Sequence, residues 1–124
     1  MNFQDIDKEL VHIASTPGII ACALVAADTG LIYLSTSSTK EFEMLAECAR
    51  DYWRLHIKNS SIFFHMGNVN SIFIQHERNL LSIQPCGTKI ILVTKAQLKE
   101  VDWSAWPSKI KPLKTMIKRY ENTS

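Results

Sequence analysis

The chain has 124 residues, of which 46% are hydrophobic and 21% are charged, and its formal net charge is +2. These proportions are typical of a globular protein and exclude an intrinsically disordered chain. The length suits one domain, so we expect a single domain over residues 1–124. The small net charge gives no indication of a polyanionic partner.

The cysteines and the N-terminus indicate the compartment. Cys22, Cys48 and Cys86 are odd in number and far apart in the sequence, which predicts reduced thiols rather than disulfides. The first ten residues carry three acidic side chains and no apolar core region, so no signal peptide is predicted. No apolar run approaches the ~20 residues of a membrane span. We therefore expect a cytoplasmic protein without a membrane span.

The first half of the chain predicts a helix, a β-hairpin and a longer helix. Apolar residues recur at helical spacing over residues 2–14. Residues 19–26 form a near-continuous apolar run, which favours a strand buried on both faces. Residues 28–30 form a turn, and residues 31–35 return as a second strand. A long helix over residues 39–58 follows.

The second half predicts three strands in a meander. Residues 61–66 fit a last helical turn, a loop or a short strand. Residues 71–76, 80–84 and 89–94 then alternate with turn signals and read as strands. The fold class expected is α/β of the α+β type, with a five-stranded, mainly antiparallel sheet and the order α-ββ-α-βββ-α.

The C-terminal segment is basic and aromatic, and it allows two interpretations. Pro107 and Pro112 predict a helix that is interrupted. Trp103, Trp106 and Tyr120 interleave with lysines, as in proteins that hold single-stranded nucleic acid. The alternative is an amphipathic helix that buries an apolar face and exposes its lysines. We favour this second interpretation. The apolar face comprises Ile110, Leu113, Ile117 and Tyr120.

The long helix carries two apolar stripes instead of one. Its start fits a capping box, in which Ser38 caps the helix and Glu41 reaches back. One stripe suits the sheet and comprises Leu45, Ala46, Ala49, Trp53, His56 and Ile57. The second stripe comprises Met44, Cys48, Tyr52 and Leu55. The C-terminal helix or a partner subunit must cover the second stripe. We favour a partner subunit, because a large uncovered apolar patch promotes association.

Residues 17–32 resemble the opening of the Roadblock/dynein light-chain domain. This opening has a Pro-Gly pair after the first helix, a small and apolar first strand, a turn at Gly30 and an apolar second strand. The order of elements and the length match that family along nearly the whole chain. Residues 61–70 and the Trp-rich, proline-broken C-terminus depart from the family pattern.

The resemblance implies an assembly and a partner. Members of the family form homodimers or heterodimers in which the second helices pack together and the third strands pair edge to edge. They act as dynein light chains, or as scaffolds and regulators of small Ras-like GTPases, in bacteria usually a GTPase of the gliding-polarity type. A homodimer and a small GTPase partner are therefore expected. The positions that map onto the interface are Met44, Cys48, Tyr52, Leu55, Ile72, Phe73 and Ile74.

No catalytic, cofactor-binding or metal-binding pattern is present in the sequence. It contains neither GxxxxGK[ST] nor GxGxxG, and its histidines have no metal-ligand spacing. Cys86, before Gly87, is the one candidate for a reactive thiol near a loop. We expect a binding module and not an enzyme. A small-ligand sensor domain is the remaining alternative, although no polar set converges in the expected core.

Overall fold

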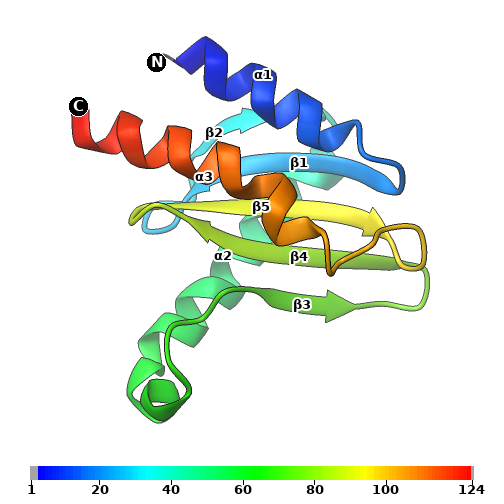
Figure 1. Cartoon of the computed structure of the whole chain (residues 1–124). Helices are drawn as coiled ribbons and strands as arrows, with labels where there is room; N and C mark the ends of the chain where they lie inside the picture. Colours follow the sequence, from blue (N-terminus) through cyan, green and yellow to red (C-terminus); the bar gives the residue numbers. More distant parts are fainter. Residues whose placement is uncertain (1–2, 124) are drawn as a thin grey trace.

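A computed structural model describes residues 3–123, which form a five-stranded sheet with helices on both faces (Figure 1). The strand order is β2-β1-β5-β4-β3, and every neighbouring pair is antiparallel. The expected fold class and the order α-ββ-α-βββ-α are therefore confirmed. The strands are β1 (Ile19–Ala26), β2 (Ile32–Ser35), β3 (Ile72–Gln75), β4 (Asn79–Cys86) and β5 (Ile90–Gln97).

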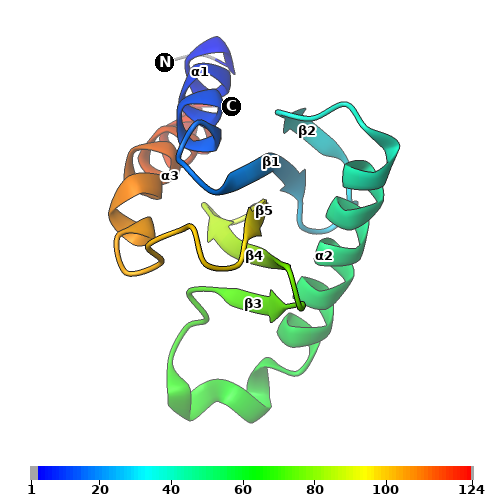
Figure 2. The same cartoon turned by 90° about the vertical axis from the view of Figure 1, so that its right-hand side faces the viewer.

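The helices divide unequally between the two faces of the sheet (Figure 2). The helices α1 (Phe3–Ala14) and α3 (Trp106–Thr123) lie side by side on one face. The helix α2 (Lys40–Lys58) lies alone on the other face and leads into a short 3₁₀ helix, η1 (Ser60–Met66). Asn2, the first residue of the predicted N-terminal helix, lies outside the described residues.

The strand β1 is buried on both faces, as its continuous apolar run predicts. Its side chains alternate between two hydrophobic clusters, because successive residues of a strand point to opposite faces. Cys22 and Leu24 face α1 and α3, whereas Ala23 and Val25 face α2. The sheet therefore separates two cores, one for each helical layer.

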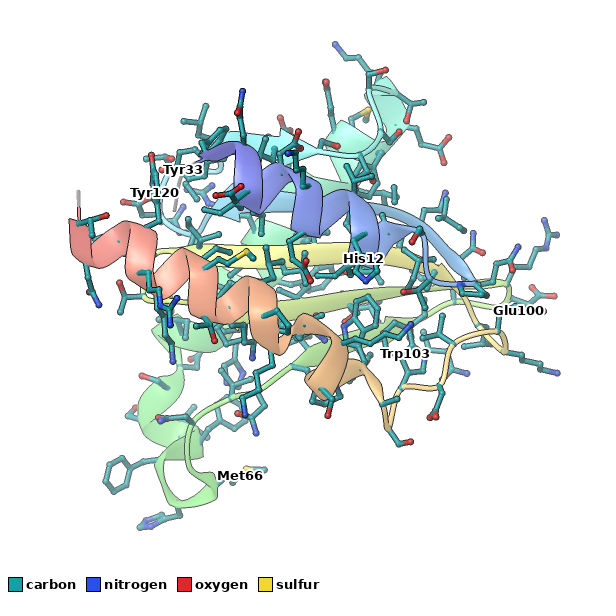
Figure 3. All side chains as sticks on the ribbon, turned by 45° about the horizontal axis from the view of Figure 1, so that its top comes forward. His12, Tyr33, Met66, Glu100, Trp103 and Tyr120 are labelled. Carbon is teal, nitrogen blue, oxygen red and sulfur yellow. The ribbon has the colours of Figure 1, made fainter. Side chains whose placement is uncertain are left out.

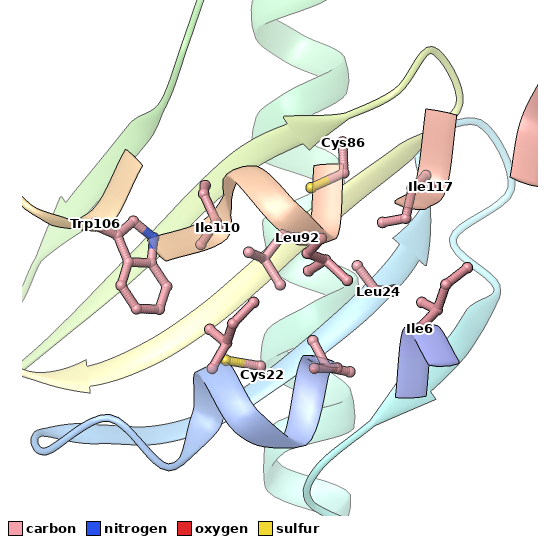
Figure 4. Close-up of a cluster of buried hydrophobic side chains, with 11 residues drawn as sticks. Ile6, Cys22, Leu24, Cys86, Leu92, Trp106, Ile110 and Ile117 are labelled. Carbon is pink, nitrogen blue, oxygen red and sulfur yellow. The ribbon is translucent and has the colours of Figure 1, made fainter. Parts of the chain in front are cut away.

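The core between the sheet, α1 and α3 is closed by large side chains (Figure 4). The helix α1 contributes Ile6, Leu10 and Ile13, which recur at helical spacing. The buried residues of α3 are Trp106, Ile110, Leu113 and Ile117.

The predicted interruption of the last helix is wrong, because α3 is continuous from Trp106 to Thr123. Pro107 lies in the first turn, where a missing backbone N–H removes no helical hydrogen bond. Pro112 lies inside the helix and removes the bond to the carbonyl of Ser108. Ser108 and Pro112 are both exposed, so water can hydrate the carbonyl of Ser108. The buried face of α3 meanwhile holds the helix against the sheet.

The start of α2 differs from the predicted capping box by one residue. Thr39 is the N-cap, and its hydroxyl accepts a hydrogen bond from the backbone N–H of Phe42 at 3.3 Å. Glu41 is then the second helical residue, too early to reach back to the cap as predicted from Ser38. Its carboxylate lies 3.7 Å from the Lys95 ammonium instead.

The sheet-facing stripe of α2 is confirmed over most of its length and wrong at its C-terminal end. Ala46, Ala49 and Trp53 are buried as predicted, but Phe42, which the predicted stripe omits, is buried too. Ile57 is exposed, because the last turn of α2 reaches the level of β3, which is an edge strand of the sheet (Figure 2). Little of the sheet is left for this turn to cover.

The strands β4 and β5 are longer than predicted. Their antiparallel register continues from Asn79 opposite Gln97 to Cys86 opposite Ile90. Pro85 is the penultimate residue of β4, close to the strand end, where a proline disturbs the ladder least. Over residues 3–123, no helix has the length and apolar character needed to cross a membrane.

Candidate interaction surface

The second apolar stripe of α2 is open to solvent. Met44, Tyr52 and Leu55 expose 58%, 48% and 61% of their surface, and the thiol-bearing Cys48 is exposed between them. These four residues, called here the α2 stripe, follow one another at spacings of three or four. They therefore lie along one side of the helix, away from the buried Ala46 and Ala49.

No described element of the chain covers the α2 stripe. The C-terminal helix, which was one candidate to cover it, packs with α1 on the opposite face of the sheet (Figure 2). That intramolecular alternative is therefore wrong. An apolar stripe left open in this way is typical of a protein-interaction surface.

The strand β3 provides an open sheet edge beside the stripe. Its only strand neighbour is β4, so the outer backbone groups of Ile72–Gln75 have no strand partner among the described residues. Ile72 and Ile74 point towards the α2 layer and are half-buried against its core. Phe73 points to the opposite face, where its ring meets Trp103 edge to face at 5.3 Å.

The predicted interface residues thus fall into two groups. The C-terminal end of α2, to which Leu55 belongs by sequence, approaches the level of β3 (Figure 2). The side chain of Phe73 lies on the face that carries α3, so only its backbone belongs to the edge. The indole Nε1 of Trp103, which packs between Phe73 and Trp106, is buried without a hydrogen-bond partner.

The helix η1 forms a third apolar surface, which the predicted interface does not include. Ile62, Phe64 and Met66 expose 73%, 77% and 81% of their surface, the largest fractions among the bulky apolar side chains of residues 3–123. Met66 projects away from the rest of the molecule in Figure 3. The signal in the sequence was the Ile-Phe-Phe run in the segment that departs from the family pattern.

A groove of about 360 Å³ lies between the first half of α2 and the turn that follows β3. Leu45, Leu80 and Leu81 form its apolar part. Its rim carries charges of both signs, including the Glu41–Lys95 pair. The groove is not visible in the sequence, because its residues come from three separate parts of the chain.

The cysteines do not have the accessibility that the sequence suggested. Cys86, the candidate for a reactive thiol, is fully buried in β4, and burial raises its pKa to about 12. Burial also raises the pKa of Cys22 to about 12. Cys48 is the exposed thiol. Within residues 3–123, no three His, Cys, Asp or Glu side chains lie together in a way that could hold a metal ion.

The structure also removes the basis for nucleic-acid binding by the C-terminal aromatic residues. Trp106 is only 2% exposed and packs in the core, and Trp103 is held between Trp106 and Phe73. Neither indole can stack on a base without leaving these contacts. Tyr120 is partly exposed, with its ring 6.2 Å from that of Phe3. The lysines of α3 therefore have no aromatic platform of the predicted kind.

Solved structures with the same architecture are known. A Roadblock/LC7 domain from Streptomyces avermitilis matches with a TM-score of 0.78 and 17% identity, covering 97% of this chain and 98% of that one. MglB from Myxococcus xanthus matches with a TM-score of 0.77 and 13% identity over 100% of both chains. An MglB structure with a tetrameric arrangement matches with a TM-score of 0.73 and 13% identity, over 94% of this chain and 88% of that one.

No protein-family model matches the sequence, and no curated protein matches it. The chain has the fold of the Roadblock/LC7 domain, as the resemblance in residues 17–32 predicted. At identities between 13% and 17%, these similarities show the fold alone. A partner has to be inferred from the chain's own surface.

Proposed function

We propose that this chain is a single Roadblock-like domain over residues 1–124 that forms a homodimer and acts as a scaffold or regulator of a small Ras-like GTPase. The observation that carries this proposal is the open α2 stripe beside the open edge of β3. Both lie where the family resemblance puts the contact between subunits. The three thiols are unpaired, which supports a reducing, cytoplasmic compartment.

A single partner can cover both the α2 stripe and the open edge of β3. A strand edge offers backbone hydrogen bonds, and the stripe offers apolar area for burial. A second copy of the chain carries the same stripe and the same strand edge. It can therefore cover both, because a two-fold interface uses the same patch on each subunit. The tetrameric arrangement of one MglB structure supports self-association in proteins of this fold.

A GTPase partner rests on the resemblance and on the similarity to MglB, which is called a gliding protein in Thermus thermophilus. A homodimer leaves the face made by α1 and α3 free on each subunit. In this proposal the chain itself needs no catalytic group, because it acts by binding a partner that carries the nucleotide.

Self-association is tested by Leu55→Glu, which puts a charge on the α2 stripe. We expect the purified chain to sediment as a dimer and the variant as a monomer with an unchanged circular dichroism spectrum. Met44→Glu tests the other end of the stripe. If both variants unfold, the stripe is needed within the chain and the proposal is wrong.

The GTPase partner is tested with purified Ras-like GTPases from the source organism, each loaded with GDP or with a non-hydrolysable GTP analogue. We expect one GTPase to bind the dimer and to bind better in one nucleotide state. Equal weak binding of all of them in both states would contradict the regulatory role while leaving the dimer intact.

A further inference from the structure

The helix η1 displays its apolar side chains in a fixed conformation. Phe63 stacks on the imidazole of His56 with ring centroids 4.5 Å apart, which anchors η1 to the end of α2. The backbone N–H of Ile62 donates to the carbonyl of Asn59, and Gly67, with a φ of +82°, ends the segment. An ordered segment of this kind loses little conformational entropy on binding.

The position of η1 places it outside the chain's own sheet. It lies beyond the β3 edge, on the side that a second sheet would approach (Figure 2). It also lies beyond the end at which β3 begins, so the edge of Ile72–Gln75 remains open (Figure 1). A subunit that pairs with this edge must therefore pass close to η1.

Antiparallel pairing determines which part of the partner η1 meets. When two β3 strands pair about a two-fold axis, the start of each strand lies beside the end of the other. The segment η1 precedes β3, and the β3–β4 turn at 76–78 follows it. The η1 of one subunit is thus brought to the β3–β4 turn of the other. The groove formed by Leu45, Leu80 and Leu81 opens at that turn.

We propose that η1 is a docking arm whose Phe64 side chain enters this groove on the partner subunit. The inference rests on the proposed dimer and adds a second, reciprocal contact to it. The groove is large enough for an aromatic side chain, and its apolar floor matches the apolar tip of the arm. Its rim includes Glu41, Glu77, Arg78 and Lys95, whose charges balance.

Intersubunit crosslinking tests the arm. The exposed Cys48 is first changed to serine, which leaves only the two buried thiols. One protein then carries His65→Cys on η1, and a second carries Glu77→Cys on the groove rim; both positions are exposed. The two proteins are mixed, allowed to exchange subunits and oxidised. We expect a disulfide between positions 65 and 77 of different chains, identified by mass spectrometry.

A matched control replaces Glu77→Cys with Lys118→Cys, an exposed position on α3. We expect no disulfide between positions 65 and 118. If the mixed proteins sediment as dimers but positions 65 and 77 do not crosslink, or crosslink no faster than 65 and 118, the arm is wrong and the dimer stands. If they are monomers, the proposed dimer itself fails, and the arm fails with it.

The dissociation constant of the dimer gives an independent readout. Phe64→Ser removes an exposed ring and is expected to leave the fold unchanged, since surface substitutions rarely affect stability. We expect it to raise the dissociation constant about tenfold or more. Leu31→Ser, at an exposed apolar residue in the β1–β2 turn, is the control and is expected to leave it unchanged. Equal dissociation constants for the two variants and the parent would overturn the arm.

Discussion

The two faces of the sheet have different amounts of cover. Five strands span about 19 Å, and a helix with its side chains is about 10 Å wide. Two helices, α1 and α3, therefore cover one face, whereas α2 alone leaves part of the other face open. The residues of α2 that face the sheet include Ala46 and Ala49, which allow close packing.

The difference teaches that burial and exposure follow the number of helices on each face. On the face with α1 and α3, the sheet-facing apolar side chains of both helices are buried in one cluster. On the other side of the molecule, α2 and η1 keep large apolar side chains in water, among them Met44, Leu55 and Phe64. We therefore assign stability to the first face and association to the second.

The largest effect is expected from a core substitution on the covered face. Leu113→Ala removes a fully buried side chain and should lower the free energy of unfolding by about 2–5 kcal/mol. Leu55→Ala removes an exposed side chain and should change it by about 0.5 kcal/mol or less at low protein concentration. Urea denaturation measures both. Comparable losses from the two variants would mean that the faces do not differ as described.

A smaller effect is expected at the start of α2. Thr39→Ala removes the hydroxyl that caps Phe42 and should cost about 1 kcal/mol of stability. Ser38→Ala is the control, because the N-cap of α2 is Thr39 and not Ser38. The same denaturation measurement decides between them. A loss with Ser38→Ala and none with Thr39→Ala would restore the predicted capping box.

The thiols distinguish the two faces chemically. Cys22 and Cys86 lie in the covered core, and Cys48 lies on the open stripe. A thiol reagent should label one cysteine in the folded protein and three after denaturation. Labelling of Cys48 should slow as protein concentration rises, because dimer formation covers it. Rapid labelling of Cys86 in the folded state would contradict the burial of that face.

The same two buried thiols make the stability of the fold depend on pH. Burial raises the pKa of both to about 12, above the ordinary value near 9. Between these values the unfolded chain releases the protons that the folded chain retains, so stability should fall as the pH rises from about 9 to about 12. Denaturation across this range measures the fall. A Cys22→Ala variant with an unchanged slope would contradict the part assigned to Cys22.

Sequence patterns predicted the elements whose burial follows a simple period. The continuous apolar run of residues 19–26 gave the central strand, and the two stripes of α2 were visible from its helical spacing. Pro112 misled the prediction of the last helix, since its cost depends on whether the freed carbonyl can reach water. Local sequence alone does not contain that information.

The candidate site was predicted less completely. The α2 stripe was found from periodicity, but the β3 positions came from the resemblance, and Phe73 proved to face the other side of the sheet. Whether Cys86 or Trp106 is accessible depends on contacts between distant elements, which a single sequence does not show. The groove joins Leu45 to Leu81 and Lys95 only after folding.

Sedimentation velocity of the unmodified chain tests the central claim, that the face covered by α2 is completed by a second copy. At tens of micromolar we expect a dimer, and the Leu55→Glu variant measured alongside should be a folded monomer. An unmodified chain that remains monomeric at that concentration would contradict the account.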